Sequence, residues 1–292
     1  MSRPRRKGNP LAKGLVGAVL VVGLGVGVVV GVGYLLGGTS PVLVMPRCTA
    51  NVDGSSWSLT PEQSDNAALI AIMTVRRGLP AHAATVGLAT AIQESKLRNL
   101  DYGHSDSLGL FQQRPSQGWG TEEQVTDPVY ATGTFYDHLV KVPDWQDVPV
   151  TQAAQAVQRS AFPDAYADHE SAARVWASAL TGHSPKALTC TLRAADHPGS
   201  VTALTDRIVR DIGELRVETV DGDRTVVVVD AASLERDDPQ RMAWAVGQWA
   251  VAVASTEQVV EVQVADQRWT RNGKWTQTDD RAADGMVLIT LA

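Results

Sequence analysis

The sequence is poor in cysteine and lacks the common metal, nucleotide and serine-hydrolase motifs. Its 292 residues include only two cysteines, Cys48 and Cys190. A zinc site needs more ligands at closer spacing, and the six histidines form no HExxH-like cluster. We therefore expect no metal and no cofactor. Neither GxSxG nor GxxxxGKS/T occurs, so serine-hydrolase and nucleotide-binding functions have no support in the sequence.

Basic and aromatic residues are also scarce. The net charge is −6, and aromatic residues make up 5% of the chain. Nucleic-acid binding usually needs a basic face, so we expect no nucleic-acid partner. The even cysteine count favours a disulfide in an exported protein. A bond between Cys48 and Cys190 would tie together the two ends of the stretch that they enclose.

Charged residues are absent from Leu15 to Leu36. A helix needs roughly 20 apolar residues to cross a bilayer. The preceding residues 1–14 are basic and contain no acidic side chain, and positive charge stays in the cytoplasm. We therefore expect a cytoplasmic basic tail over residues 1–14 and a transmembrane helix in the lipid bilayer over residues 15–36. The prediction is a single-pass cell-membrane protein whose bulk is extracytoplasmic.

A cleaved signal peptide is the alternative to a retained anchor. Its apolar core would be shorter, and a small-x-small cleavage site should follow. No good site follows this run, so we favour the anchor. Within it, Gly23, Gly27 and Gly31 share a four-residue spacing, which suits self-association through one helix face. A span rich in glycine by composition explains that spacing slightly better.

The rest of the chain divides by composition. Residues 37–56 are rich in Gly, Ser, Thr and Pro and are typical of a linker. Residues 57–190 show helical patterns without strand alternation. Thr60 followed by Pro61 predicts a helix start, and a small-residue face after Pro80 predicts a buried central helix. Helices are expected from about 61 to 77, from Pro80 onward, and at 127–140, 150–159 and 169–180.

Residues 191–292 read as a small α+β domain of unknown role. We expect a helix near 200–213, a hairpin at 215–229, a helix at 239–254, strands at 259–264 and 286–291, and a turn at Asn272-Gly273. Trp269 and Trp275 flank that turn and are candidates for contacting a partner. The expected fold class is therefore a mostly α domain after one transmembrane helix, plus this C-terminal α+β domain.

Glu94 is the first candidate for chemistry. It lies in Ala91-Ile92-Gln93-Glu94-Ser95 at the end of an otherwise small and apolar helix. The negative end of the helix dipole and apolar surroundings both disfavour a charged carboxylate. Both effects raise its pKa, as a general acid at neutral pH requires. Taken alone, a glutamate in a last helical turn is more often a solvated surface residue.

A second stretch follows a polar loop. It is Asp106-Ser107-Leu108-Gly109-Leu110-Phe111-Gln112-Gln113. Gly109 indicates a close backbone approach, and the Gln112 amide offers a donor and an acceptor suited to sugar amides and hydroxyls. Alone, this stretch is also compatible with an ordinary turn into a helix.

The two stretches together resemble the soluble lytic transglycosylase family and its lysozyme-like relatives. In that family a catalytic Glu-Ser is followed by Gly-Leu-Met-Gln or a close variant. Here Glu94-Ser95 is followed by Gly109-Leu110-Phe111-Gln112. The resemblance covers about residues 59–180. It implies a lysozyme-like fold for residues 57–190 and peptidoglycan as the partner. Glu94 would cleave the bond between N-acetylmuramic acid and N-acetylglucosamine as general acid and base. Candidate substrate-binding residues are Ser95, Gly109, Phe111, Gln112, Trp119 and Gln158.

The reaction type depends on a second acid. Asp101 and Asp106 lie between the two motifs, and either is a candidate for positioning a water, as hydrolysis commonly requires. Each is also compatible with a role in capping a turn. The resemblance favours the transglycosylase route, in which the muramic C6 hydroxyl attacks C1 and forms a 1,6-anhydro sugar.

The chain departs from the family at one motif. The family usually has a Tyr-Asn-Ala-Gly-like stretch whose tyrosine touches the catalytic glutamate, but residues 156–160 contain no tyrosine. Gln158 is a candidate for contacting Glu94 or the substrate, and Tyr166 follows. This departure and the absence of a second acid motivate the alternative function, an inactive lysozyme-like module that binds peptidoglycan. A scaffold role in an envelope secretion machine is also compatible with the sequence.

Overall fold

The computed structural model describes residues 45–160, 163–235 and 238–292. The predicted basic tail, the transmembrane helix and the glycine face of Gly23, Gly27 and Gly31 lie outside these residues, as do residues 37–44 of the predicted linker. Among the helices that are described, none is long and apolar enough to cross a membrane. Residues Met45–Ala292 pack as one unit.

The first half of this unit is built around two buried helices, α2 (Pro61–Arg76) and α3 (Ala81–Ser95). Thr60 and Gln63 form a capping box at the start of α2, which satisfies backbone N–H groups that the helix leaves free. Gly87 lets α3 approach its neighbours closely, because a Cβ there would lie 2.6 Å from the Tyr136 hydroxyl. Helix α2 begins at Pro61 after Thr60, and α3 begins directly after Pro80, as the sequence predicts. The remaining elements of this half are η1 (Pro115–Gln117), α4 (Glu122–Thr126), α5 (Pro128–Leu139), α6 (Val150–Gln158), η2 (Pro163–His169) and α7 (Glu170–Leu180).

A three-stranded antiparallel sheet borders these helices in the order β2-β1-β3. Its strands are β1 (Arg47–Val52), β2 (Ser55–Leu59) and β3 (Leu188–Thr191). Cys48 and Cys190 face each other in the β1–β3 register and form a disulfide. The predicted disulfide is thus confirmed, and it joins two strands that are 142 residues apart in the sequence.

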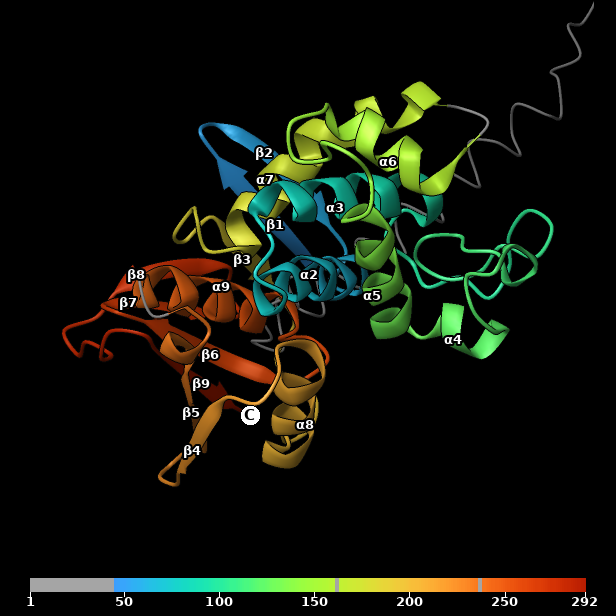
Figure 1. Cartoon of the computed structure of the whole chain (residues 1–292). Helices are drawn as coiled ribbons and strands as arrows, with labels where there is room; N and C mark the ends of the chain where they lie inside the picture. Colours follow the sequence, from blue (N-terminus) through green and yellow to red (C-terminus); the bar gives the residue numbers. More distant parts are fainter. Residues whose placement is uncertain (1–44, 161–162, 236–237) are drawn as a thin grey trace, which may run out of the picture. The chain divides into compact units, whose positions relative to one another are not determined.

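The second half holds a six-stranded antiparallel sheet in the order β4-β5-β9-β6-β7-β8. Helix α9 (Pro239–Ala252) contacts β6 and β9 of this sheet on one side, and α2 and α7 on the other, as Figure 1 shows. Every residue of α9 from Met242 to Ala252 is buried. The other elements are α8 (Val201–Asp211), β4 (Arg216–Val220), β5 (Val226–Asp230), η3 (Ala231–Ser233), β6 (Val259–Val264), β7 (Gln267–Thr270), β8 (Lys274–Gln277) and β9 (Met286–Leu291).

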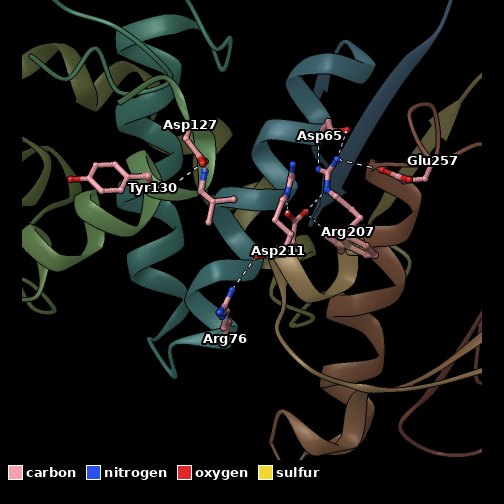
Figure 2. Close-up of polar contacts among 10 residues, drawn as sticks. Asp65, Arg76, Asp127, Tyr130, Arg207, Asp211 and Glu257 are labelled. Carbon is pink, nitrogen blue, oxygen red and sulfur yellow. Dashed lines mark hydrogen bonds and ion pairs between the residues drawn. The ribbon is translucent and has the colours of Figure 1, made fainter. Parts of the chain in front are cut away.

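A buried charge cluster joins the two halves (Figure 2). The Arg207 guanidinium on α8 forms ion pairs with Asp65 of α2, with Asp211 and with Glu257. Arg207 is 9% exposed, and the Asp211 side chain is fully buried. Trp249 of α9 also donates a hydrogen bond to Asp211 at 3.0 Å. Because buried charges need such partners, the cluster fixes α8 against α2 and α9.

The expected fold class is wrong. The described residues form eight α-helices and two antiparallel sheets, not a mostly α domain after a transmembrane helix with a separate α+β addition. Strands β1 and β3 alternate polar and apolar residues but span only six and four residues, and they were not predicted from the sequence. Strand β2 lacks such alternation and is exposed at four of its five positions. Strand β1 also lies in the stretch that the sequence predicted as linker. The expected turn at Asn272-Gly273 joins β7 and β8, two paired strands to which the sequence pattern assigns no bounds.

Candidate active site

Glu94 lies in the last turn of α3, and hydrogen bonds from α2 hold the residues that follow this helix. The helix ends at Ser95, and Lys96 and Leu97 both adopt positive φ angles of 54° and 58°. Two amide side chains of α2 satisfy the carbonyls that this ending leaves free. Gln63 donates to the Lys96 oxygen at 2.9 Å, and Asn66 donates to the Leu97 oxygen at 2.9 Å. The backbone beside Glu94 is therefore anchored to the neighbouring helix.

Two polar side chains approach the Glu94 carboxylate. The Tyr166 hydroxyl of η2 donates a hydrogen bond to Glu94 Oε1 at 2.7 Å, and the Gln158 side chain at the end of α6 lies within hydrogen-bonding reach. Burial raises the pKa of Glu94, while the hydrogen bonds from Tyr166 and Gln158 oppose that shift. Burial, rather than the helix end, is thus the main cause of the raised pKa.

The two sequence motifs meet through their backbones. Ser95 donates a hydrogen bond from Oγ to the Leu110 carbonyl at 2.7 Å, and Gln158 donates from Nε2 to the Phe111 carbonyl at 2.8 Å. The Gly109–Gln112 turn is therefore held between α3 and α6. Ser95 and Gln158, both predicted as substrate-binding residues, position this turn beside Glu94.

Gly109 and Gln112 shape the loop before α4. Gly109 has a φ of 77°, and a Cβ there would lie 2.1 Å from the Val125 carbonyl oxygen, so only glycine fits. The Gln112 amide donates to the carbonyls of Tyr102 and Gly109, each at 3.3 Å. Gly109 therefore permits the close backbone approach that the sequence predicts, and Gln112 stabilises the loop through its two hydrogen bonds. Gln112 remains half-buried.

The Phe111 side chain faces the protein interior. It is fully buried and stacks on Phe135 of α5 with ring centroids 4.6 Å apart. The structure therefore places this ring in the core and leaves its carbonyl, bound by Gln158, as the part nearest the candidate site.

The two candidate second acids lie in a different cavity from Trp119. Asp106 accepts hydrogen bonds from Arg114 Nε at 2.7 Å and from the Ser116 N–H at 2.7 Å. These bonds, above all the one from Arg114, hold the pKa of the Asp106 carboxyl well below its usual range. Asp101 is exposed and lines the same cavity as Asp106. Within the described residues, neither aspartate forms a hydrogen bond or an ion pair with Glu94.

Trp119 and Gln158 share a cavity of about 670 Å³. Trp119 lies after η1 and packs against the His138 ring, with centroids 4.4 Å apart. Gln158 reaches both this cavity and the Glu94 carboxylate. Gln158 therefore links this cavity to Glu94, which is not itself one of the lining residues.

Two contacts in this region were not predicted from the sequence. Tyr166 contacts Glu94, whereas the sequence shows only that this tyrosine follows residues 156–160. His169 at the end of η2 lies with Nε2 2.8 Å from Gln93 Oε1. Both contacts depend on how η2 folds back onto α3, and a short 3₁₀ segment gives no periodic signal.

The described side chains include no group of three or more His, Cys, Asp or Glu residues placed to hold a metal ion. No protein-family model matches this sequence, and no curated protein matches it significantly. The motif resemblance and the geometry around Glu94 are therefore the grounds for a functional proposal.

Proposed function

We propose that the protein cleaves the glycan strands of peptidoglycan between N-acetylmuramic acid and N-acetylglucosamine, with Glu94 as general acid and then base. The observation that carries this proposal is the Glu94 carboxylate itself. Burial raises its pKa, and Tyr166 fixes Oε1 through a 2.7 Å hydrogen bond. A general acid needs both a defined position and a proton near the working pH.

The disposition of the acids supports the lytic transglycosylase route over hydrolysis. Enzymes that activate water commonly use a second carboxylate on the opposite side of the bond. Of the two sequence candidates, Asp106 is occupied by Arg114 and the Ser116 N–H, and Asp101 lines the same cavity as Asp106. A single carboxylate suffices when the attacking group belongs to the substrate.

The steps then balance without water. Protonated Glu94 gives its proton to the glycosidic oxygen as the bond from C1 to that oxygen breaks. The C6 hydroxyl of the same muramic residue attacks C1, and its proton returns to Glu94. The product carries a 1,6-anhydro end, and the carboxyl group is restored to its starting state.

The alternative of an inactive binding module rested on two observations, the missing tyrosine at residues 156–160 and the absence of a second acid. A tyrosine from η2 contacts Glu94, and this contact supports the enzyme over the inactive module on the first point. The transglycosylase route requires no second acid. The resemblance to soluble lytic transglycosylases, carried by Glu94-Ser95 and Gly109–Gln112, supports the same proposal. Work on peptidoglycan also requires export, which agrees with the Cys48–Cys190 disulfide.

The test compares Glu94→Gln with the parent protein on purified cell walls. We expect release of soluble glycan fragments to fall by about 100-fold or more, the usual scale for losing a general acid. Glu218→Gln is the matched control, because Glu218 is exposed on β4, and it should digest walls at the parent rate. Equal digestion by Glu94→Gln and the parent would refute the role of Glu94.

A further inference from the structure

The cavity lined by Trp119 and Gln158 has an unusual charge for this protein. It opens near the ends of α5 and α6, and its lining includes Lys141 and Arg159 but no aspartate or glutamate. The chain as a whole carries a net charge of −6. Lys141 and Arg159 are exposed, and in the described residues neither forms an ion pair. Two cations are therefore free to meet an anionic ligand.

A neighbouring cavity shows the opposite character. It is lined by Asp101, Asp106, Glu122 and Glu123 and has a volume of about 540 Å³. An anionic group would be repelled there and attracted to the cavity with Lys141 and Arg159. The charge difference therefore assigns anion binding to the cavity that also contains Gln158.

Trp119 adds a flat apolar surface to the cationic cavity. It is half-buried, and its ring is held against His138 at a centroid distance of 4.4 Å. An aromatic face held in place by a second ring suits contact with a ring or an aliphatic chain. The combination of this face with two cations fits a ligand that carries both apolar parts and carboxylates.

Peptidoglycan carries such groups on the muramic residue, next to the bond that Glu94 would cleave. The peptide stems attached to muramic acid contain aliphatic side chains and several free carboxylates, whereas a strand whose stems have been hydrolysed off keeps only the single lactyl carboxylate on each muramic residue. Gln158 lines the cavity and contacts Glu94, so a stem on the residue being cleaved could enter it.

We infer that this cavity binds the stem peptide through Lys141 and Arg159, so that the protein cleaves strands with stems in preference to strands without them. The inference rests on the proposed glycan cleavage by Glu94. A competing explanation is that both cations serve helix ends, since Lys141 follows α5 and Arg159 follows α6 and cations are favourable there. That role would affect stability but not substrate choice.

The experiment uses the full chain and two substrates, soluble glycan strands with their stems and the same strands after amidase removal of the stems. The kcat/KM for strands with stems should exceed that for stripped strands by about twofold to fivefold, because the stripped strand keeps one lactyl carboxylate and loses about one partly exposed charge pair. In the K141Q/R159Q variant this ratio should fall toward one, and raised salt should lower it in the parent. The matched control is K186Q/R193Q, whose residues are exposed and lie outside the cavity, and its ratio should equal that of the parent.

Binding by calorimetry with the Glu94→Gln variant keeps the inference testable apart from catalysis. We expect tighter binding of strands with stems, and loss of that difference when Lys141→Gln and Arg159→Gln are added. If the parent cleaves both substrates equally and K141Q/R159Q does the same, the inference fails while glycan cleavage stands. If the parent cleaves neither, the proposed cleavage fails, and the binding difference alone then decides whether the cavity recognises stems.

Discussion

Tyr166 donates a hydrogen bond from its hydroxyl to Glu94 Oε1 at 2.7 Å, across 72 residues of sequence. The bond stabilises the charged form of the carboxylate and so opposes the upward shift in the pKa that burial causes. Tyr166 therefore controls both where the carboxyl group points and when it carries a proton.

Replacing Tyr166 by Phe should move the pH dependence of cleavage. Without the hydroxyl, the pKa of Glu94 rises further, because burial acts with less opposition. The protonated acid then persists to higher pH, and the alkaline limb of kcat/KM shifts upward. A pH–rate profile measures this shift. Tyr102→Phe is the control, since Tyr102 is 67% exposed and makes no side-chain contact with Glu94. An unchanged alkaline limb in Tyr166→Phe would show that Tyr166 does not tune the acid.

The Glu94→Gln variant should also change stability in a pH-dependent way. The folded state raises the pKa of Glu94 above its unfolded value, so the wild-type side chain contributes stability at low pH and loses that contribution as pH rises through the folded pKa. A neutral amide has no such loss. Relative to the parent, Glu94→Gln should therefore melt higher at neutral pH, and its advantage should shrink as the solution is acidified.

Thermal melts of both proteins across the acidic to neutral range measure that difference. Glu218→Gln again serves as the control and should follow the parent at each pH. If Glu94→Gln melts below the parent at neutral pH, the carboxylate is stabilising there, and the account of a buried acid with a raised pKa is wrong.

Arg207 should be among the most important charged residues for stability (Figure 2). Replacing it by Ala leaves the nearly buried Glu257 without its arginine and the fully buried Asp211 with only one of its two arginine partners, Arg210. Breaking a buried ion pair on one side typically costs about 3–5 kcal/mol. Urea unfolding should show a loss of that size. Arg174→Ala, which removes an exposed pair with Glu170 on α7, should cost less than about 0.5 kcal/mol. Equal effects of the two changes would contradict the assigned role of the cluster.

The disulfide should be a major contributor to stability. Cys48 and Cys190 are 142 residues apart in the sequence, and closing so long a loop in the unfolded chain is worth about 5 kcal/mol in the chain-entropy model. The Cys48→Ser/Cys190→Ser variant should therefore melt well below the parent in the absence of reductant, and reductant should lower the melting temperature of the parent alone. A parent melting temperature that does not respond to reductant would exclude this contribution.

The sequence predicted the local features of the fold and missed those made by distant segments. Thr60, Gln63 and Pro61 signal the start of α2, and the small residues around Gly87 signal a buried α3, because caps and helix periodicity are properties of neighbouring residues. Strand β2, with its exposed Ser-Ser-Trp-Ser run, has no such pattern. Its place in a sheet with β1 and β3 depends on pairing across the whole first half.

The same division holds for the candidate site. Glu94, Ser95 and Gly109–Gln112 could be singled out because they form local motifs, and the Cys48–Cys190 pair because only two cysteines exist. Tyr166 could not be assigned to Glu94, since a 3₁₀ segment must first fold back against α3. Phe111 was expected to meet substrate, but its ring is needed in the core against Phe135. Burial of that kind follows from packing rather than from the motif.

Mass spectrometry of the fragments that the full chain releases from purified peptidoglycan tests the central claim most directly. The account predicts muramic residues with 1,6-anhydro ends in the parent digest and their loss in Glu94→Gln. Reducing muramic ends would contradict the transglycosylase route and indicate hydrolysis. The absence of any fragment, or equal fragments from parent and variant, would contradict glycan cleavage by Glu94 altogether.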